Sequence, residues 1–145
     1  MLSYRLYKTN IKEHFMSNKT SEHGEFCWNE LMTPNVKKAK EFYSELFGWE
    51  THDHDMEHMT YTMFKAAGKD IGGMMQIPAG QEQQIPPHWM SYIYVHDLDA
   101  TVEKAKSLGA LIKVDKTQVG DFGRFAIIED PTGAHIAMWQ SLKEC

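Results

Sequence analysis

The chain has 145 residues, of which 42% are hydrophobic and 24% charged, and a net charge of −5. This ordinary composition argues against disorder, and the acidic balance argues against a general nucleic-acid binder, which needs clustered Lys and Arg. No run approaches the roughly 20 apolar residues that a membrane-spanning helix requires. We therefore expect one compact domain that uses neither nucleic acid nor a membrane as a partner.

The two ends of the chain carry the information on compartment. Residues 1–23 lack the continuous apolar centre of a secretory signal and show no regular period. We expect a loosely held arm here, with Met16 as an alternative start and packing on a partner subunit as an alternative role. Cys27 and Cys145 are too few for a disulfide framework and form no CxxC pair, which favours the cytoplasm.

The first half of the chain, residues 24–77, predicts a strand, a helix and three further strands. Apolar and polar residues alternate over 26–32, the period of a strand with two unlike faces. Asn35 is the predicted N-cap of the helix, and Gly48 is expected to end it in the left-handed conformation. The three strands that follow are expected at residues 49–55, 60–66 and 69–77.

The second half, residues 88–141, predicts the same order of elements. It follows the segment 78–87, which is rich in Pro, Gly and Gln and is expected to be a linker. A strand over 89–95 leads into a helix that starts within 96–100 and is expected to end at Gly109. The predicted buried face of this helix is formed by Val102, Ala105 and Leu108, and the last three strands are expected at 110–116, 123–129 and 135–140.

Equivalent positions of the two halves stand at a nearly constant distance along the chain. Asn35 and Asp97 are 62 positions apart, as are Thr33 and Val95, and the two helix-ending glycines are 61 apart. A fixed offset of this kind indicates an internal duplication with two copies.

Five motifs follow one another along the two copies of this repeat. They are Glu30-Leu-Met-Thr, Ala39-Lys-Glu-Phe-Tyr43 with Leu46-Phe-Gly-Trp49, Ile71-Gly-Gly-Met74, Val95-His-Asp-Leu98, and Gly123-Arg-Phe-Ala with Asp130-Pro-Thr-Gly133. The order of these motifs, together with the repeat, makes the chain resemble the vicinal oxygen chelate superfamily, the group of glyoxalases, extradiol dioxygenases and bleomycin-resistance proteins. The resemblance implies an α+β fold in which two βαβββ modules in tandem form an open, eight-stranded, barrel-like sheet around a cleft. It also implies a homodimer. The domain would cover residues 24–141, with modules 24–77 and 88–141.

The resemblance also carries an expectation about metal ligands. Metal-dependent members of the family take one ligand, typically His or Glu, from the first and last strand of each module, because such a site needs converging imidazole and carboxylate donors. By register the four positions here are Trp28, Met75, Met90 and Ala137, and a slip of one residue gives Asn29, Gln76, Trp89 and Ile136. Neither set supplies four ligands. We therefore expect no metal ligands and no cofactor, with a divalent metal as the open alternative. The absence of these ligands also argues against the metal-dependent activities of the family, including those of lactoylglutathione lyase and ring-cleaving dioxygenase.

A second group of potential ligands lies at residues 52–58, where five of the seven positions are His or Asp, four of them within the predicted strand 49–55. His52 and His54 share a strand face, which suits adventitious Ni²⁺ or Zn²⁺. The group also contains Glu57 and His58, but it lies on the second strand of the module, where the family does not build its site. Cys27 faces away from Trp28 and is expected to be an inert thiol.

The residues predicted to face the cleft are mainly aromatic rings and thioethers, which suit a flat or hydrophobic organic ligand. The alternative is that they only fill a barrel interior. The ligand-binding candidates are Trp28, Gly73, Met75, Met90, Tyr94, Ala137 and Trp139.

Glu30 is the strongest candidate for a catalytic residue, because it shares a strand face with Trp28. A carboxylate in such a place has its charged form disfavoured and can act as a general base. Arg124 or Tyr92 would then steady developing negative charge. The structural alternatives are a Glu30 paired with Arg124 or with backbone, and an Arg124 on the surface near a turn.

These observations predict a glyoxalase-like protein that binds a small organic molecule without an obligatory metal. A metal-independent lyase or isomerase with Glu30 as its base is the alternative, and a metal-dependent enzyme of the glyoxalase or dioxygenase type is the third possibility.

Overall fold

A computed structural model describes residues 21–55 and 59–142 of the protein, and this part of the chain forms two compact units. Unit 1 comprises the described residues between 28 and 90, and unit 2 comprises residues 21–27 and 91–142. The expected N-terminal arm lies almost entirely outside the described residues. None of the described helices is long and apolar enough to cross a membrane.

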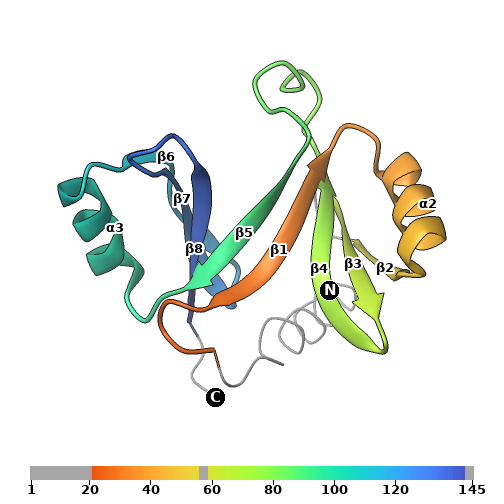
Figure 1. Ribbon diagram of the computed structural model, residues 1–145, viewed down its shortest axis with the longest axis horizontal. Coiled ribbons are helices and arrows are strands. Elements are labelled where there is room, and N and C mark those ends of the chain that lie inside the picture. Colours follow the sequence, from red (N-terminus) through yellow and green to blue (C-terminus); the bar gives the residue numbers. More distant parts are fainter. Residues whose placement is uncertain (1–20, 56–58, 143–145) are drawn as a thin grey trace. The chain divides into compact units, whose positions relative to one another are not determined.

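Unit 1 is built on four strands and one helix (Figure 1). The strands follow the order β2-β3-β4-β1; β1 and β4 run parallel, and the other two pairs are antiparallel. The elements are β1 (Phe26–Thr33, in unit 1 from Trp28 onward), α2 (Val36–Phe47), β2 (Glu50–Asp55), β3 (Thr60–Ala66) and β4 (Lys69–Gln76).

Unit 2 repeats this arrangement in the order β5-β8-β7-β6, again with its first and last strands parallel. Its elements are β5 (His88–Tyr94, in unit 2 from Ser91 onward), α3 (Leu98–Ser107), β6 (Leu111–Val119), β7 (Gly123–Glu129) and β8 (His135–Ser141). The predicted tandem of two βαβββ modules is therefore confirmed, and each unit's sheet is open. The predicted linker 78–87 contains neither helix nor strand.

The two helices begin as their sequences predict, and α2 also ends as predicted. Oδ1 of Asn35 accepts a 3.0 Å hydrogen bond from the amide of Lys38, and Oδ1 of Asp97 accepts one of the same length from Ala100. Each cap satisfies an amide that the first helical turn leaves without a partner. Gly48 follows α2 with a φ of 70°, a left-handed conformation that glycine adopts without steric cost.

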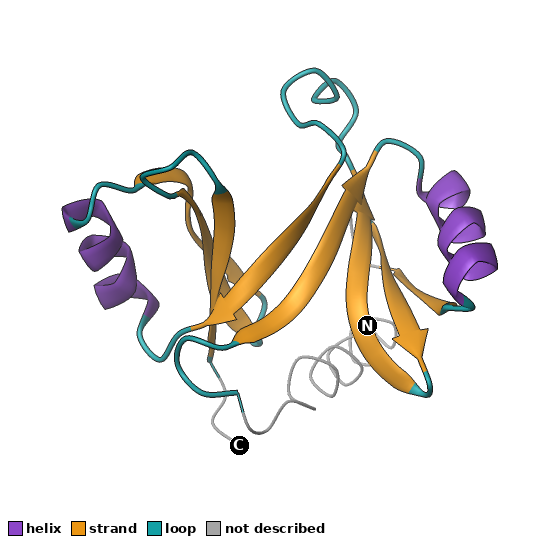
Figure 2. Ribbon diagram, viewed as in Figure 1, coloured by secondary structure: helices purple, strands orange, loops and turns teal. Residues whose placement is uncertain are grey.

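The core of unit 1 lies between α2 and one face of its sheet (Figure 2). Leu31, Phe64 and Met74 form its buried centre. Because side chains alternate along a strand, Leu31 of β1 points to this face, whereas Trp28 and Glu30 point to the opposite one. The residues packed around the centre are Val36, Ala39, Tyr43, Trp49 and Ile71.

The core of unit 2 lies between α3 and its sheet, and here two sequence predictions were wrong in detail. The predicted buried residue Leu108 is 67% exposed, because α3 ends at Ser107 and Leu108 is already its C-cap. Strand β6 continues to Val119, beyond the predicted end at residue 116, since its pairing with β7 extends through two register shifts. The buried centre consists of Val95, Leu98, Val102, Ala126 and Met138.

Candidate functional site

Three side chains on the face of unit 1 opposite α2 form a continuous hydrogen-bond chain. Nε1 of Trp28 donates to the hydroxyl of Tyr61 at 3.0 Å, and that hydroxyl donates to Oε2 of Glu30 at 2.8 Å. Trp28 and Tyr61 are buried and Glu30 is half-buried. Trp28 and Glu30 project from β1 with the spacing of two residues that places them on one face, and Tyr61 reaches them from β3. The indole and the carboxylate are thus held by one phenol.

Gly73 of β4 makes room for this arrangement. It is the Cα partner of Glu30 in the parallel β1/β4 pair. A Cβ atom on residue 73 would collide with the hydroxyl and ring atoms of Tyr61. The absent side chain therefore lets the phenol cross β4 and reach β1, which gives the second glycine of the Ile71-Gly-Gly-Met74 motif a physical role.

On the same face of the unit 1 sheet as Glu30, the neighbouring side chains of β4, β3 and β2 include thioethers and imidazoles. Met63, the Cα partner of both Gly73 and His52, is fully buried. His54 is the Cα partner of Tyr61, is itself buried, and contacts His52 with a ring-centroid distance of 5.9 Å. Burial, followed by the neighbouring positive charge of His52, lowers the pKa of His54 below its usual value. The side chains beside Glu30 on this face are therefore mainly thioethers and imidazoles.

The predicted ligand-binding residues divide between the two units. Trp28, Gly73, Met75 and Met90 belong to unit 1, where Trp28, Gly73 and Met90 are buried and Met75 is half-buried. Tyr94, Ala137 and Trp139 belong to unit 2, as does Tyr92, the catalytic candidate expected to steady negative charge.

The four residues in unit 2 share one face of its sheet. Tyr92 pairs with Ala137, and Tyr94 pairs with Trp139, in the parallel β5/β8 register. Phe125 extends this face on β7, with its ring centroid 6.4 Å from that of Tyr92. The sequence grouping of these side chains thus agrees with their placement, and they form a face lined by rings on unit 2.

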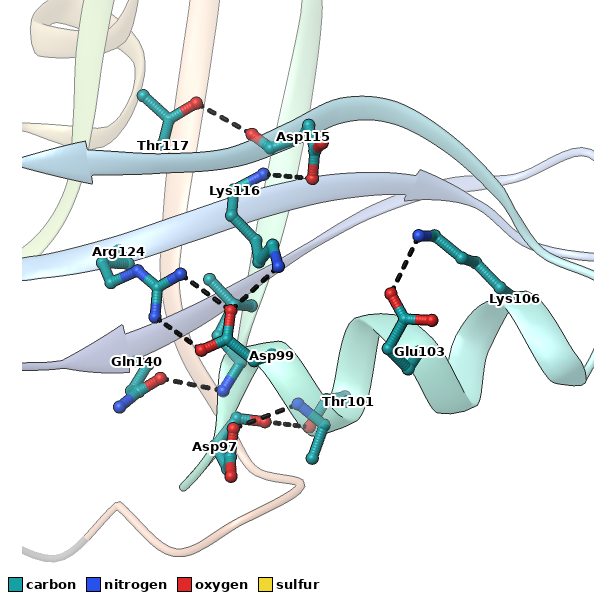
Figure 3. Close-up of polar contacts among 12 residues, drawn as sticks. Asp97, Asp99, Thr101, Glu103, Lys106, Asp115, Lys116, Thr117, Arg124 and Gln140 are labelled. Carbon is teal, nitrogen blue, oxygen red and sulfur yellow. Dashed lines mark hydrogen bonds and ion pairs between the residues drawn. The ribbon is translucent and has the colours of Figure 1, made fainter.

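Arg124 lies on the other face of the unit 2 sheet, beside α3 (Figure 3). Its two terminal nitrogens donate to the two carboxylate oxygens of Asp99 at 3.1 and 2.9 Å, and Nζ of Lys116 is 2.9 Å from the same carboxylate. Hydrogen bonds from Arg124 and Lys116 hold the pKa of Asp99 well below its usual range. Arg124 is therefore engaged away from Tyr92, and Glu30 is bonded to Tyr61 rather than to Arg124, so we do not retain Arg124 as a partner of Glu30.

The four family ligand positions do not fit a metal ion in an N/O site. The indole nitrogen of Trp28 carries a hydrogen that it donates to Tyr61, and Met75, Met90 and Ala137 end in thioethers and a methyl group, which are not hard donors. Within the described ranges, no three His, Cys, Asp or Glu side chains converge. In the group at 52–58, Asp53 is bonded to Lys40 and Thr62. Glu57 and His58 lie outside the described residues.

Tyr61 is the functional candidate that the sequence did not reveal. Within β3 it appears only as an aromatic residue in an alternating strand, which is typical of any half-buried sheet. The informative signal was its combination with Gly73, because a glycine within a strand often marks the close approach of another group.

Comparison with known proteins identifies the family of this chain. The model of the Glyoxalase/Bleomycin resistance protein/Dioxygenase superfamily matches residues 22–138. The chain is 35% identical over 116 residues to "Putative glyoxylase CFP32" of Mycobacterium tuberculosis, an alignment that covers 79% of this chain and 44% of that protein. It is 30% identical over 126 residues to the anthracycline biosynthesis protein DauV of Streptomyces sp. strain C5, covering 79% and 46%. The chain thus spans less than half the length of these relatives.

Solved structures share the fold at much lower sequence identity. Methylmalonyl-CoA epimerase from Mycobacterium tuberculosis aligns with a TM-score of 0.59 at 16% identity, covering 84% of this chain and 91% of that one. The protein BH1468 from Bacillus halodurans aligns with a TM-score of 0.65 at 10% identity, covering 86% and 99%.

Proposed function

This chain belongs to the Glyoxalase/Bleomycin resistance protein/Dioxygenase superfamily, and we propose that it binds a small organic molecule on the face of unit 1 that carries Trp28 and Glu30. The ligand would have an aromatic or otherwise apolar body and one polar group that donates a hydrogen bond. Binding would need no metal ion.

The observation that carries this proposal is the chain from Trp28 through Tyr61 to Glu30. An apolar surface with a few convergent polar groups is the usual composition of a small-molecule site. A ligand body would lie against the rings and thioethers, and its donor group would meet the carboxylate of Glu30. The phenol of Tyr61 limits the rotamers of Glu30, which lowers the entropic cost of binding.

The names of the relatives agree with a small organic ligand. DauV is named for anthracycline biosynthesis, CFP32 is named as a glyoxylase, and one structural neighbour is methylmalonyl-CoA epimerase. Each of these names refers to the chemistry of a small organic molecule. The planar rings of anthracyclines also match the aromatic character of the face around Trp28.

The test begins with a thermal-shift screen of aromatic, quinone-like, aldehyde and thiol-adduct metabolites, because a ligand selective for the folded state raises its stability. For a compound that binds, the Glu30→Gln variant should bind roughly ten- to hundredfold more weakly, since a hydrogen bond to a charged group is lost. Glu45→Gln, on the exposed surface of α2, is the matched control and should bind as the native chain does. Equal affinity for all three proteins, with no loss of turnover in Glu30→Gln for any compound that the native chain converts, would remove Glu30 from the site.

The second candidate function is a metal-independent isomerase with Glu30 as general base, favoured by the 2.8 Å contact with Tyr61. In that reaction Glu30 would take a proton from a carbon next to a carbonyl group, and the phenol of Tyr61 would orient the carboxylate. The same carboxylic acid would return the proton to a neighbouring carbon on the same face of the enolate, so that atoms balance without a further reactant.

One variant separates the two functions. If Glu30 is a base, Glu30→Gln loses turnover but keeps most of its affinity for the substrate. If Glu30 only binds, the variant loses affinity and the native chain shows no exchange of substrate protons with deuterium oxide. Tyr61→Phe should show a smaller loss than Glu30→Gln, of affinity if Glu30 only binds and of turnover if Glu30 is a base. The substitution removes the hydroxyl that orients Glu30 and leaves the ring in place.

We also infer that two copies associate through α2. Its outer surface exposes Phe42, Leu46 and Phe47, each 57% accessible. A two-fold axis next to Phe42 would bring Lys38 of one copy level with Glu45 of the other, which makes this surface self-complementary in charge. In sedimentation velocity, Phe42→Asp should give monomers, whereas Leu108→Asp, at a leucine that is 67% exposed directly after α3, should not. An unchanged dimer in Phe42→Asp would place the interface elsewhere.

The proposed compartment is the cytoplasm, supported by a sequence with two cysteines and no CxxC pair. Fractionation of cells that express the native protein would test the assignment.

A further inference from the structure

We propose that unit 1 holds a second ligand site, on the α2 side of its sheet, that takes a planar aromatic ring. The site is a pocket of about 340 Å³, within the size range of small-molecule sites. It is lined by Asn29, Trp49, Phe64, Ile71, Gly72 and Trp89.

The walls of this pocket are three aromatic rings at different angles. The indoles of Trp49 and Trp89 are nearly perpendicular, at 85° with centroids 6.2 Å apart. Phe64 lies between these orientations, at 53° to Trp49 and 38° to Trp89. Aromatic pairs prefer offset-stacked or edge-to-face contacts. A planar guest can stack on one indole while it meets the edge of the other, which a flexible saturated chain cannot do.

The exposed wall of the pocket is fixed in place before any ligand arrives. Trp89 is 41% exposed, yet its Nε1 donates a 3.1 Å hydrogen bond to the hydroxyl of Tyr43. The Tyr43 ring in turn stacks on Trp49 at 18° with a centroid distance of 5.5 Å. An indole held by a specific bond loses little rotamer freedom on binding, so its surface is pre-organised for a ligand.

The floor of the pocket is an irregular part of the sheet. The β3/β4 register shifts between Phe64 and Lys65, which leaves Ile71 without a Cα partner in the pair. Gly72 lies next to it, and a Cβ atom there would be 2.8 Å from the backbone oxygen of Asn29. β-Bulges and strand glycines are frequent where a ligand or another chain segment approaches closely.

This pocket is separate from the face that carries Trp28 and Glu30. Asn29 lines the pocket and stands between those two residues on β1, so its side chain points to the opposite side of the sheet. Phe64, Trp49 and Ile71 also belong to the packing between sheet and α2. A ligand in the pocket therefore touches neither Glu30 nor Tyr61.

The probe for the test is 2-naphthol, with the saturated alcohol 2-decalol as a control of similar size. The chain has four tryptophans, and their indole N–H signals in ¹H–¹⁵N spectra can be assigned from single Trp→Phe variants. We expect 2-naphthol to shift the Trp49 and Trp89 signals saturably, in the native chain and equally in Glu30→Gln. The variant Trp89→Leu should bind roughly two- to tenfold more weakly, the loss of one aromatic pair.

Three results would overturn this assignment: no shift of Trp49 or Trp89 up to the solubility limit of 2-naphthol, equal affinity for 2-decalol, or undiminished affinity in a folded Trp89→Leu. If Trp89→Leu does not fold, Asn29→Leu and Ile71→Ala test the pocket from its other walls, and unchanged affinity in both would count against it. Shifts confined to Trp28 would likewise contradict this site while supporting the proposed function. Failure of the Glu30→Gln test alone would leave the pocket unaffected.

Discussion

The ring of Tyr61 occupies the space that a side chain on Gly73 would need. Tyr61 belongs to β3 and Gly73 to β4, so the contact joins neighbouring strands. It also sets the geometry beyond it, because the same hydroxyl bonds Trp28 and Glu30. The shape of the candidate site thus depends on a missing methyl group.

A methyl group at this position should displace Tyr61. Gly73→Ala is expected to destabilise the fold by about 1–3 kcal/mol, the usual cost of an overpacked site. In the background of Tyr61→Ala the same substitution should cost far less, because the colliding ring is gone. Urea unfolding of the four proteins of this double-mutant cycle measures the difference. An equal cost in both backgrounds would show that the collision with Tyr61 is not the reason for the glycine.

The N-cap of α2 offers a test of local stability. Asn35→Ala should lower the free energy of unfolding by about 1 kcal/mol, because the amide of Lys38 loses its acceptor. Asn35→Asp keeps an oxygen at the same place and should be nearly neutral. Thermal or urea unfolding of both variants makes the comparison, and a full loss in Asn35→Asp would indicate that the amide group of Asn35 has a role beyond capping.

The thiol of Cys27 should be unreactive in the folded protein. Burial is the main cause that raises its pKa, from 9.0 to about 11, and its Sγ donates a 3.5 Å hydrogen bond to the backbone oxygen of Tyr92. Two pKa units reduce the thiolate fraction about hundredfold at neutral pH, so alkylation should slow by at least that factor relative to the unfolded chain. The measurement uses Cys145→Ser, which leaves one thiol, with and without urea. Comparable rates in both conditions would contradict a buried thiol.

The pH dependence of stability should report on His54. Its pKa is lowered by burial, by His52 and by Lys65, while Asp53 opposes the shift. Between this lowered value and the usual 6.5 the unfolded chain binds the proton and the folded chain does not. The contribution of His54 is therefore present above about pH 6.5 and falls as the pH is lowered.

The measurement is urea unfolding from about pH 7.5 to about pH 5.5. The native chain should lose more stability over this range than His54→Gln. His52→Gln should also lose less, because it removes the neighbouring positive charge. Parallel curves for the native chain and His54→Gln would show that this imidazole titrates alike in both states.

Much of the fold could be predicted because the relevant rules are local. A period of two residues identified the strands, and Asn35 and Gly48 identified the two ends of α2 through a hydrogen bond and a backbone conformation that involve only near neighbours. The prediction was wrong for Leu108, where the spacing continued the helical face but the helix had ended.

By itself, the sequence determined the tandem of modules and the shared face of Trp28 and Glu30, because both depend on spacing along one segment. Only the tertiary structure decided that Glu30 is bonded to Tyr61 and that Arg124 is bonded to Asp99. Tyr61 stands 31 positions from Glu30, and their contact depends on the strand order, the register and a glycine that clears the path. These features result from the packing of the whole unit rather than from any one stretch of its sequence.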